Sequence, residues 1–210
     1  MAVELLPPYD RGPGKAPVYP YAPKSRENPA AEGLWLIVDV SDAVTAVEDQ
    51  VVRLGSLISR ADVEPFYRLL WRLNTDSYKT TQSLLFFTET VDPPQRVFQS
   101  RVLVVPFSSA IENLVLDQHF VHDLALHLWR ILSGLASLHH VYISVGALAM
   151  LYGVPPTPPN SGYCLELVIR SAAPTQREAV RKWREAVEGM ESELSKFPNS
   201  WQIPASAIPI

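Results

Sequence analysis

The segment 117–127 contains five side chains that can bind metals or transfer protons, and three of them form a regular row: His119, Asp123 and His127. They are spaced at i, i+4 and i+8, and the apolar pattern around them predicts a helix, so they share one side of it. Imidazole and carboxylate groups are zinc ligands, and they are also general acids and bases. Neighbouring members of this row, such as His119 with Asp123, could therefore hold a metal ion or support acid–base catalysis.

The same pattern has a simpler interpretation, in which the histidines lie on the solvated face of an amphipathic helix. His119 and His127 are two turns apart, roughly 12 Å along the axis, so they cannot both reach one ion. A metal site would need a further ligand, such as His139 or Cys164. Leucine, isoleucine and valine fill the other side of the predicted helix. We favour this interpretation, and a small metal-dependent or acid–base enzyme centred on His119, Asp123 and His127 is the alternative.

Other catalytic and nucleotide-binding patterns do not occur in the sequence. The nine glycines are spread singly, and neither a phosphate-binding loop nor a dinucleotide fingerprint forms without clustered glycine. There is no Gly-x-Ser-x-Gly nucleophile elbow. The single cysteine, Cys164, lies in a predicted strand, where a buried and unreactive thiol is expected. We therefore expect no cofactor, and we expect a non-enzymatic protein rather than an enzyme.

Composition indicates a globular protein without a surface for nucleic acid. Of the 210 residues, 47% are hydrophobic and 19% are charged, and the net charge is −4. Nucleic-acid-binding domains usually carry a basic stripe, whereas the basic residues of 177–188 alternate with acidic ones. No segment has the length of an apolar membrane span or the pattern of a secretion signal. We expect a soluble cytoplasmic protein that binds neither nucleic acid nor membrane.

The order of predicted elements indicates an α+β domain between two extended ends. Residues 1–32 contain seven prolines, which exclude a helix or a central strand and predict a Pro/Tyr-rich arm. Residues 33–196 form a single domain, and 197–210 form a C-terminal tail. The predicted strands are 34–40, 83–90, 96–107 and 162–170. The predicted helices are 43–60, a short one after Asp62, 109–138 and 174–196. Residues 141–145 are predicted as a loop or short strand, and 146–152 as a helical turn.

This order of elements resembles the ferredoxin-like, split β-α-β pattern. It implies a sheet of about four mostly antiparallel strands with helices on one face, followed by a C-terminal helix. That fold supports many unrelated functions, so it indicates little about activity.

Aromatic residues indicate where a partner would bind. Five tryptophans and eight tyrosines are many for this length, and both types are enriched at protein interfaces. For Trp71, Trp129 and Trp183, which fall at or near the apolar side of predicted helices, core packing with the neighbouring arginine pointing outward is the simpler interpretation. The residues that we expect at a partner interface are Tyr9, Tyr19, Tyr21, Trp183 and Trp201.

We therefore expect a protein–protein interaction module that binds a protein partner through its arm and helices. Immunity proteins, chaperones, adaptors and viral accessory or structural proteins are the classes that fit. A homodimer is a second expected arrangement, because one stripe of the last predicted helix has heptad-like spacing. Its members are Val180, Trp183, Val187, Met190 and Leu194.

Overall fold

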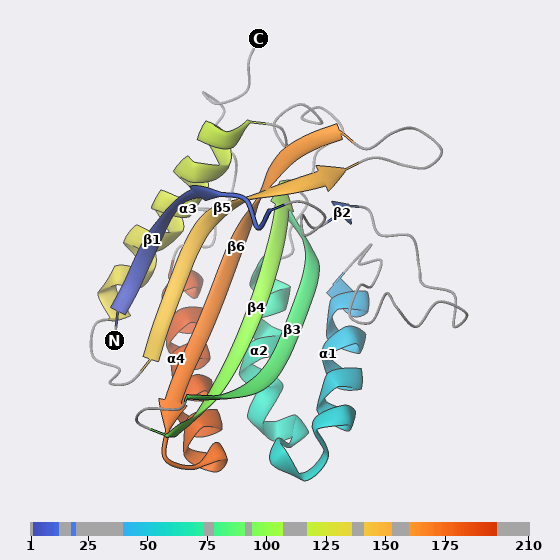
Figure 1. Cartoon of the computed structure of the whole chain (residues 1–210), viewed down its shortest axis with the longest axis vertical. Helices are drawn as coiled ribbons and strands as arrows, with labels where there is room; N and C mark the ends of the chain where they lie inside the picture. The colour runs from blue at the N-terminus through green and yellow to red at the C-terminus, as the bar shows by residue number, and fades with distance from the viewer. Residues whose placement is uncertain are drawn as a thin grey trace.

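The computed structural model describes residues 2–12, 18–19, 40–73, 78–90, 94–106, 117–135, 141–152 and 160–196. They form an α+β fold in which four helices pack on a mixed sheet (Figure 1). The helices are α1 (Val40–Leu54), α2 (Arg60–Leu73), α3 (Gln118–Leu132) and α4 (Gln176–Ser195), with short 3-10 turns η2 (Gly55–Leu57) and η4 (Ser133–Leu135). The strands are β1 (Ala2–Tyr9), β2 (Val18–Tyr19), β3 (Tyr78–Thr90), β4 (Gln95–Pro106), β5 (Val141–Tyr152) and β6 (Asn160–Ala173).

The described sheet has the strand order β1-β5-β6-β4-β3, and the two-residue strand β2 also pairs with β5. Neighbouring strands from β5 to β3 are antiparallel, whereas β1 and β2 run parallel to β5. The antiparallel hairpin predicted for 83–90 and 96–107 is confirmed as β3 and β4. The helices lie together on one face of the sheet, as predicted (Figure 1). No helix in the described part of the chain is long and apolar enough to cross a membrane.

The ferredoxin-like topology is not seen in this sheet. The first strand of that prediction, 34–40, lies outside the described residues except for Val40, which already belongs to α1. The edge beside β5 is taken by β1, and β6 lies between β5 and β4. The helical turn predicted for 146–152 is wrong, because β5 continues as a strand to Tyr152. Its small residues pair with strands on both sides, and this two-sided pairing outweighs their weak local preference.

The strand β1 comes from the segment 1–32 that the sequence predicts as an extended arm. Pro7 and Pro8 cannot donate to a ladder, so strands that contain proline are confined to sheet edges or irregular pairings. Both conditions hold here, because β1 is an edge strand and its register on β5 shifts between Leu6 and Tyr9. The described part of the arm is therefore docked on the domain.

Gly146 in β5 allows β1 to approach closely. A Cβ atom at this position would lie 2.9 Å from the Leu6 Cβ, so the two strands would have to separate. We expect Gly146→Ala to lower the free energy of unfolding by about 1–3 kcal/mol and to speed hydrogen exchange at the β1 amides. Gly134→Ala is the control, because its added Cβ meets nothing within 4 Å. Unchanged β1 protection in Gly146→Ala would contradict the close approach.

The strand β3 forms the other edge of the described sheet, and α1 packs along it. The Gln50 Oε1 atom accepts a hydrogen bond from the Leu85 backbone N–H at 2.6 Å. An edge strand with unpaired N–H groups is a template for pairing with another chain. Gln50 therefore occupies a donor on this edge that would otherwise be open.

The start of α3 lies later than the sequence predicts. Its N-cap is Asp117, whose carboxylate accepts hydrogen bonds from the backbone N–H groups of His119 at 2.8 Å and Phe120 at 3.4 Å. These bonds satisfy donors that the first helical turn leaves free. The capping box predicted at Ser109 and Glu112 lies outside the described residues.

The main core lies between the sheet and the four helices, and Trp183 of α4 is at its centre. The indole contacts Phe66 of α2 with ring centroids 5.5 Å apart and Phe98 of β4 edge-on at 4.8 Å. Its Nε1 atom donates a hydrogen bond to the Ser100 Oγ atom at 2.9 Å, so the buried N–H group is satisfied. Side chains alternate across a strand, so the other face of the sheet carries a second apolar cluster, which consists of Leu103, Val105, Leu148, Met150 and Cys164, with Tyr9 packed against it.

Candidate functional site

The histidine row of α3 is on the surface of the protein. His119, Asp123 and His127 are all exposed. Cys164 lies on the opposite face of the sheet from the helices, so it does not join this row, and His139 lies outside the described residues. Across the described ranges, no group of three or more histidine, cysteine, aspartate or glutamate side chains is placed to hold a metal ion. The solvated-face interpretation fits the exposure of the row.

Cys164 is 1% exposed, within the second apolar cluster. Burial raises the pKa of its thiol to about 12. The thiolate is the reactive form of cysteine, so this side chain is a poor nucleophile at neutral pH. Its buried position agrees with the sequence-based expectation.

The five residues expected at a partner interface have different positions. Trp183 is 0% exposed, which agrees with the core packing expected for it and leaves none of its surface for a partner in this structure. Tyr9 is half-buried against the second apolar cluster. Tyr19 forms part of β2, and Tyr21 and Trp201 lie outside the described residues.

The heptad-like stripe of α4 cannot form a seam with a second copy, because it faces the sheet and α2. All five of its members are at most 3% exposed. A stripe at helical spacing fits a core-facing side as well as a coiled-coil seam. Here the sheet supplies the partner surface for Val180, Trp183, Val187, Met190 and Leu194.

Trp71 is the aromatic residue whose position the sequence pattern failed to predict. Its side chain is 59% exposed, although core packing was expected. Phe66 and Leu70 mark the buried side of α2, and Trp71 lies about 140° from Phe66 at 100° per residue. A helical wheel centred on Phe66 would have placed it outside. The exposed large hydrophobic residues in the described part of the chain are Val52, Leu57 and Trp71, and all belong to the hairpin α1–η2–α2.

Two arginines flank Trp71 on α2, and both form ion pairs with one residue of α4. Glu191 forms ion pairs with Arg72 Nε at 3.2 Å and Arg68 Nε at 3.9 Å. The two arginine side chains are still 48% and 45% exposed. We call Trp71, Arg68 and Arg72 the α2 patch.

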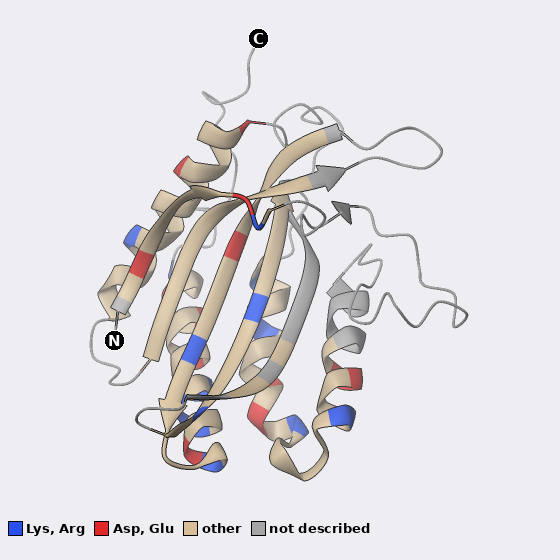
Figure 2. Ribbon diagram, in the orientation of Figure 1, with Lys and Arg blue, Asp and Glu red and all other residues tan. Residues whose placement is uncertain are grey.

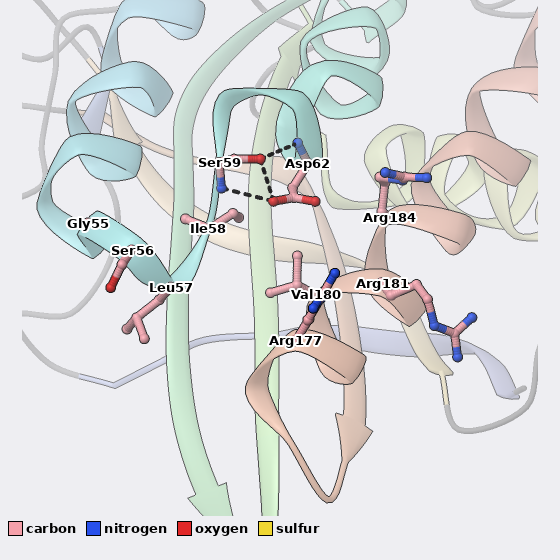
Figure 3. Close-up of a pocket in the computed structure, with 10 residues that line it drawn as sticks. All are labelled: Gly55, Ser56, Leu57, Ile58, Ser59, Asp62, Arg177, Val180, Arg181 and Arg184. Carbon is pink, nitrogen blue, oxygen red and sulfur yellow. Dashed lines mark hydrogen bonds between the residues drawn. The ribbon is translucent and has the colours of Figure 1, made fainter.

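A groove lies near the other end of α2, where η2 and the first turn of α2 face the first turns of α4 (Figure 3). Its volume is about 880 Å³. Figure 3 shows Asp62 on one side and Arg177 with Val180 on the other, while Arg181 extends away from Asp62. We call it the arginine groove, after the three arginines among its lining residues, which include Leu57, Asp62, Arg177, Val180, Arg181 and Arg184.

The α2 side of the arginine groove is fixed by a local hydrogen-bond arrangement. The backbone N–H and the hydroxyl of Ser59 both donate to the Asp62 Oδ2 atom, at 2.9 Å and 2.6 Å. Gly55, the residue that follows α1, has a φ of +58°, which a glycine adopts without strain. The carboxylate of Asp62 is therefore engaged in capping α2.

The arginines of the groove differ in their partners. Arg181 pairs with Glu185 at 2.5 Å and Arg184 with Glu188 at 3.4 Å, one turn further along α4. Arg177 makes no ion pair with any residue that the structure describes. Exposed pairs of this kind contribute little free energy. Among the described residues, the Arg177 guanidinium therefore has no carboxylate partner. Arg181 and Arg184 have carboxylate partners that a ligand can replace at little cost in free energy.

A buried ionic cluster lies on the helix-free face of the sheet, where Figure 2 shows acidic and basic positions close together on β6 and β4. The Glu166 carboxylate forms an ion pair with Arg11, which follows β1. It forms another with the Arg101 Nε atom at 2.9 Å. The Glu166 side chain is 4% exposed. Burial raises the pKa of its carboxyl to about 7, and burial, with the nearby Arg11, lowers the pKa of Arg101 to about 10.

This Glu166 cluster joins the end of β1 to the centre of the sheet. Both close neighbours of the carboxylate are guanidinium groups, which donate hydrogen bonds and do not accept protons. The cluster therefore suits anchoring better than proton transfer, and we assign it a structural role.

No protein-family model matches the chain, and searches for similar curated proteins and similar solved structures find none.

Proposed function

We propose that this protein is a non-enzymatic interaction module and that a protein partner docks on the outer side of α2 and the helices beside it. The observation that carries the proposal is the exposed Trp71, flanked by Arg68 and Arg72. Tryptophan and arginine are the residue types most enriched among interface hot spots. A tryptophan that is 59% exposed leaves a large apolar surface in water, and burial of that surface by a partner is favourable.

The helices support this proposal better than the arm does. The described residues 2–12 are engaged with their own sheet through β1 and the Glu166 cluster. Val52 of α1 and Leu57 of η2 are 79% and 40% exposed, so apolar surface is spread along the hairpin. We keep partner contact by the tyrosines of the arm as part of the proposal, although no described tyrosine side chain of the arm supports it.

A second copy of this chain is one candidate partner. Because the α4 stripe is buried, a homodimer would have to use the α2 patch or another exposed surface. Native mass spectrometry distinguishes the two cases, since a dimer of the purified chain that Trp71→Ala dissociates would identify the partner as a second copy.

The proposal predicts a covalent adduct at position 71. We expect a photo-crosslinking amino acid in place of Trp71 to yield one discrete adduct in extracts of the source cells. The adduct, identified by mass spectrometry, should be suppressed by excess unlabelled wild-type protein and not by excess Trp71→Ala protein.

The matched control carries the same crosslinker at Arg130, an exposed position on α3. Equal adducts from both positions, or equal competition by wild type and Trp71→Ala, would rule out a docking site at the α2 patch.

A further inference from the structure

We propose that the arginine groove receives an acidic peptide segment of the partner protein. This inference rests on the proposed function and adds the chemistry of the partner. The groove and the α2 patch lie along the same pair of packed helices, α2 and α4. Asp62 and Trp71 are nine residues apart on α2, which is roughly 14 Å along the axis. They also lie about 180° apart around the axis, so a partner that contacts both has to extend around the side of α2.

The charge of the groove favours a carboxylate ligand. Arg177, Arg181 and Arg184 are spaced at i, i+4 and i+7, so they line one side of α4 over roughly 10 Å. The carboxylate among the lining residues, Asp62, already accepts two hydrogen bonds from Ser59. The chain as a whole has a net charge of −4, so this arginine row is a local feature and not part of a generally basic surface.

The ends of two helices add to the same field. Both α2 and α4 begin beside the groove, since its lining includes Ser59 and Asp62 from the start of α2 and Arg177 from the start of α4. The N-terminus of a helix carries a partial positive charge. This contribution strengthens the attraction of the three guanidinium groups for an anion.

The neighbouring residues favour a peptide over a nucleic acid. Glu178, Glu185 and Glu188 alternate with the arginines along α4. A continuous phosphate backbone would bring negative charge against these glutamates, whereas a peptide can place its carboxylates at the arginine positions alone. The groove also has an apolar part, formed by Leu57, which is 40% exposed, and Val180. A segment with carboxylates a helical turn apart and one apolar side chain between them matches both parts.

A labelled peptide tests this proposal on the full chain. The probe is an eight-residue fluorescein-labelled peptide with four glutamates around a central leucine, and binding is followed by fluorescence anisotropy at low salt. We expect Arg177→Glu to weaken binding by roughly tenfold or more, because it turns an attraction into a repulsion. Arg130→Glu on α3 makes the same charge change away from the groove and should weaken binding less than about twofold. The corresponding peptide with glutamine for glutamate should not bind.

Three results would overturn the proposal. They are no binding at millimolar peptide, equal losses in Arg177→Glu and Arg130→Glu, and tighter binding of a single-stranded oligonucleotide of eight nucleotides than of the peptide. Circular dichroism establishes that each variant is folded, and Arg177→Gln replaces Arg177→Glu if the latter is not. If the adduct at position 71 forms while the peptide does not bind, this inference fails and the proposed function stands.

Discussion

The substitution Trp183→Ala is expected to lower the free energy of unfolding by about 3–5 kcal/mol, as large aromatic truncations in cores do. Trp183 is fully buried and contacts aromatic rings of both α2 and β4. Its removal leaves a cavity where three elements meet, and it leaves the buried Ser100 hydroxyl without its donor. A domain of ordinary stability, about 5–15 kcal/mol, would lose a large part of it.

The same substitution at Trp71 is the matched control. Because that side chain is 59% exposed, Trp71→Ala should change the free energy of unfolding by no more than about 0.5 kcal/mol. Urea unfolding followed by circular dichroism measures both variants. Similar losses in the two would show that Trp183 does not occupy the centre of the core. The comparison also separates the stability of the fold from partner binding. Trp183→Ala should have the larger effect on stability, whereas Trp71→Ala should have the larger effect on partner binding.

The second large effect concerns pH and Glu166. Its pKa in the folded protein is about 7, above the ordinary value of 4.5, because the carboxyl is buried. A raised pKa means that the folded state holds the proton more tightly than the unfolded state. The stability contribution is therefore full below about pH 4.5 and is lost as the pH rises to 7. Over this range we expect a loss on the order of 3 kcal/mol.

The measurement is the difference between wild type and Glu166→Gln in urea unfolding from pH 4.5 to 8. Other titrating groups contribute equally to both proteins, so the difference isolates Glu166. We expect wild type to lose stability relative to Glu166→Gln as the pH rises. The opposite slope would show that the ion pairs with Arg11 and Arg101 outweigh burial and hold the carboxyl ionised.

Elements with strong periodicity were predictable from the sequence. The helix α4 and the strand β4 were predicted close to their observed bounds, whereas β3 begins five residues earlier than the predicted strand 83–90. The strand β5 was not, since Gly146 and Ala147 have weak local preferences and its pairing partners, β1 and β6, are distant in sequence. The edge strand β1 was hidden by its prolines, which are tolerated only because of where the strand lies in the sheet.

The candidate sites were less predictable than the fold. The arginine groove joins Asp62 to Arg177, and the Glu166 cluster joins Arg11 to Arg101 and Glu166. Local spacing contains no information about contacts between such distant segments. The histidine row, by contrast, is local, and its spacing was as apparent in the sequence as in the structure. Its solvent exposure was also the favoured interpretation, because leucine, isoleucine and valine fill the other side of the helix.

The parallel pairing of β1 with β5 sets an order of events during synthesis. Ala2 pairs with Tyr142 and Leu5 with Val145, so β1 waits during synthesis for a segment made about 140 residues later. At 5–20 residues per second this delay is roughly seven to thirty seconds. During that time the β5 edge does not yet exist and β1 has no strand to join. The strand β1 is thus made well before it can be placed in the sheet, and contacts of such large sequence separation also slow refolding.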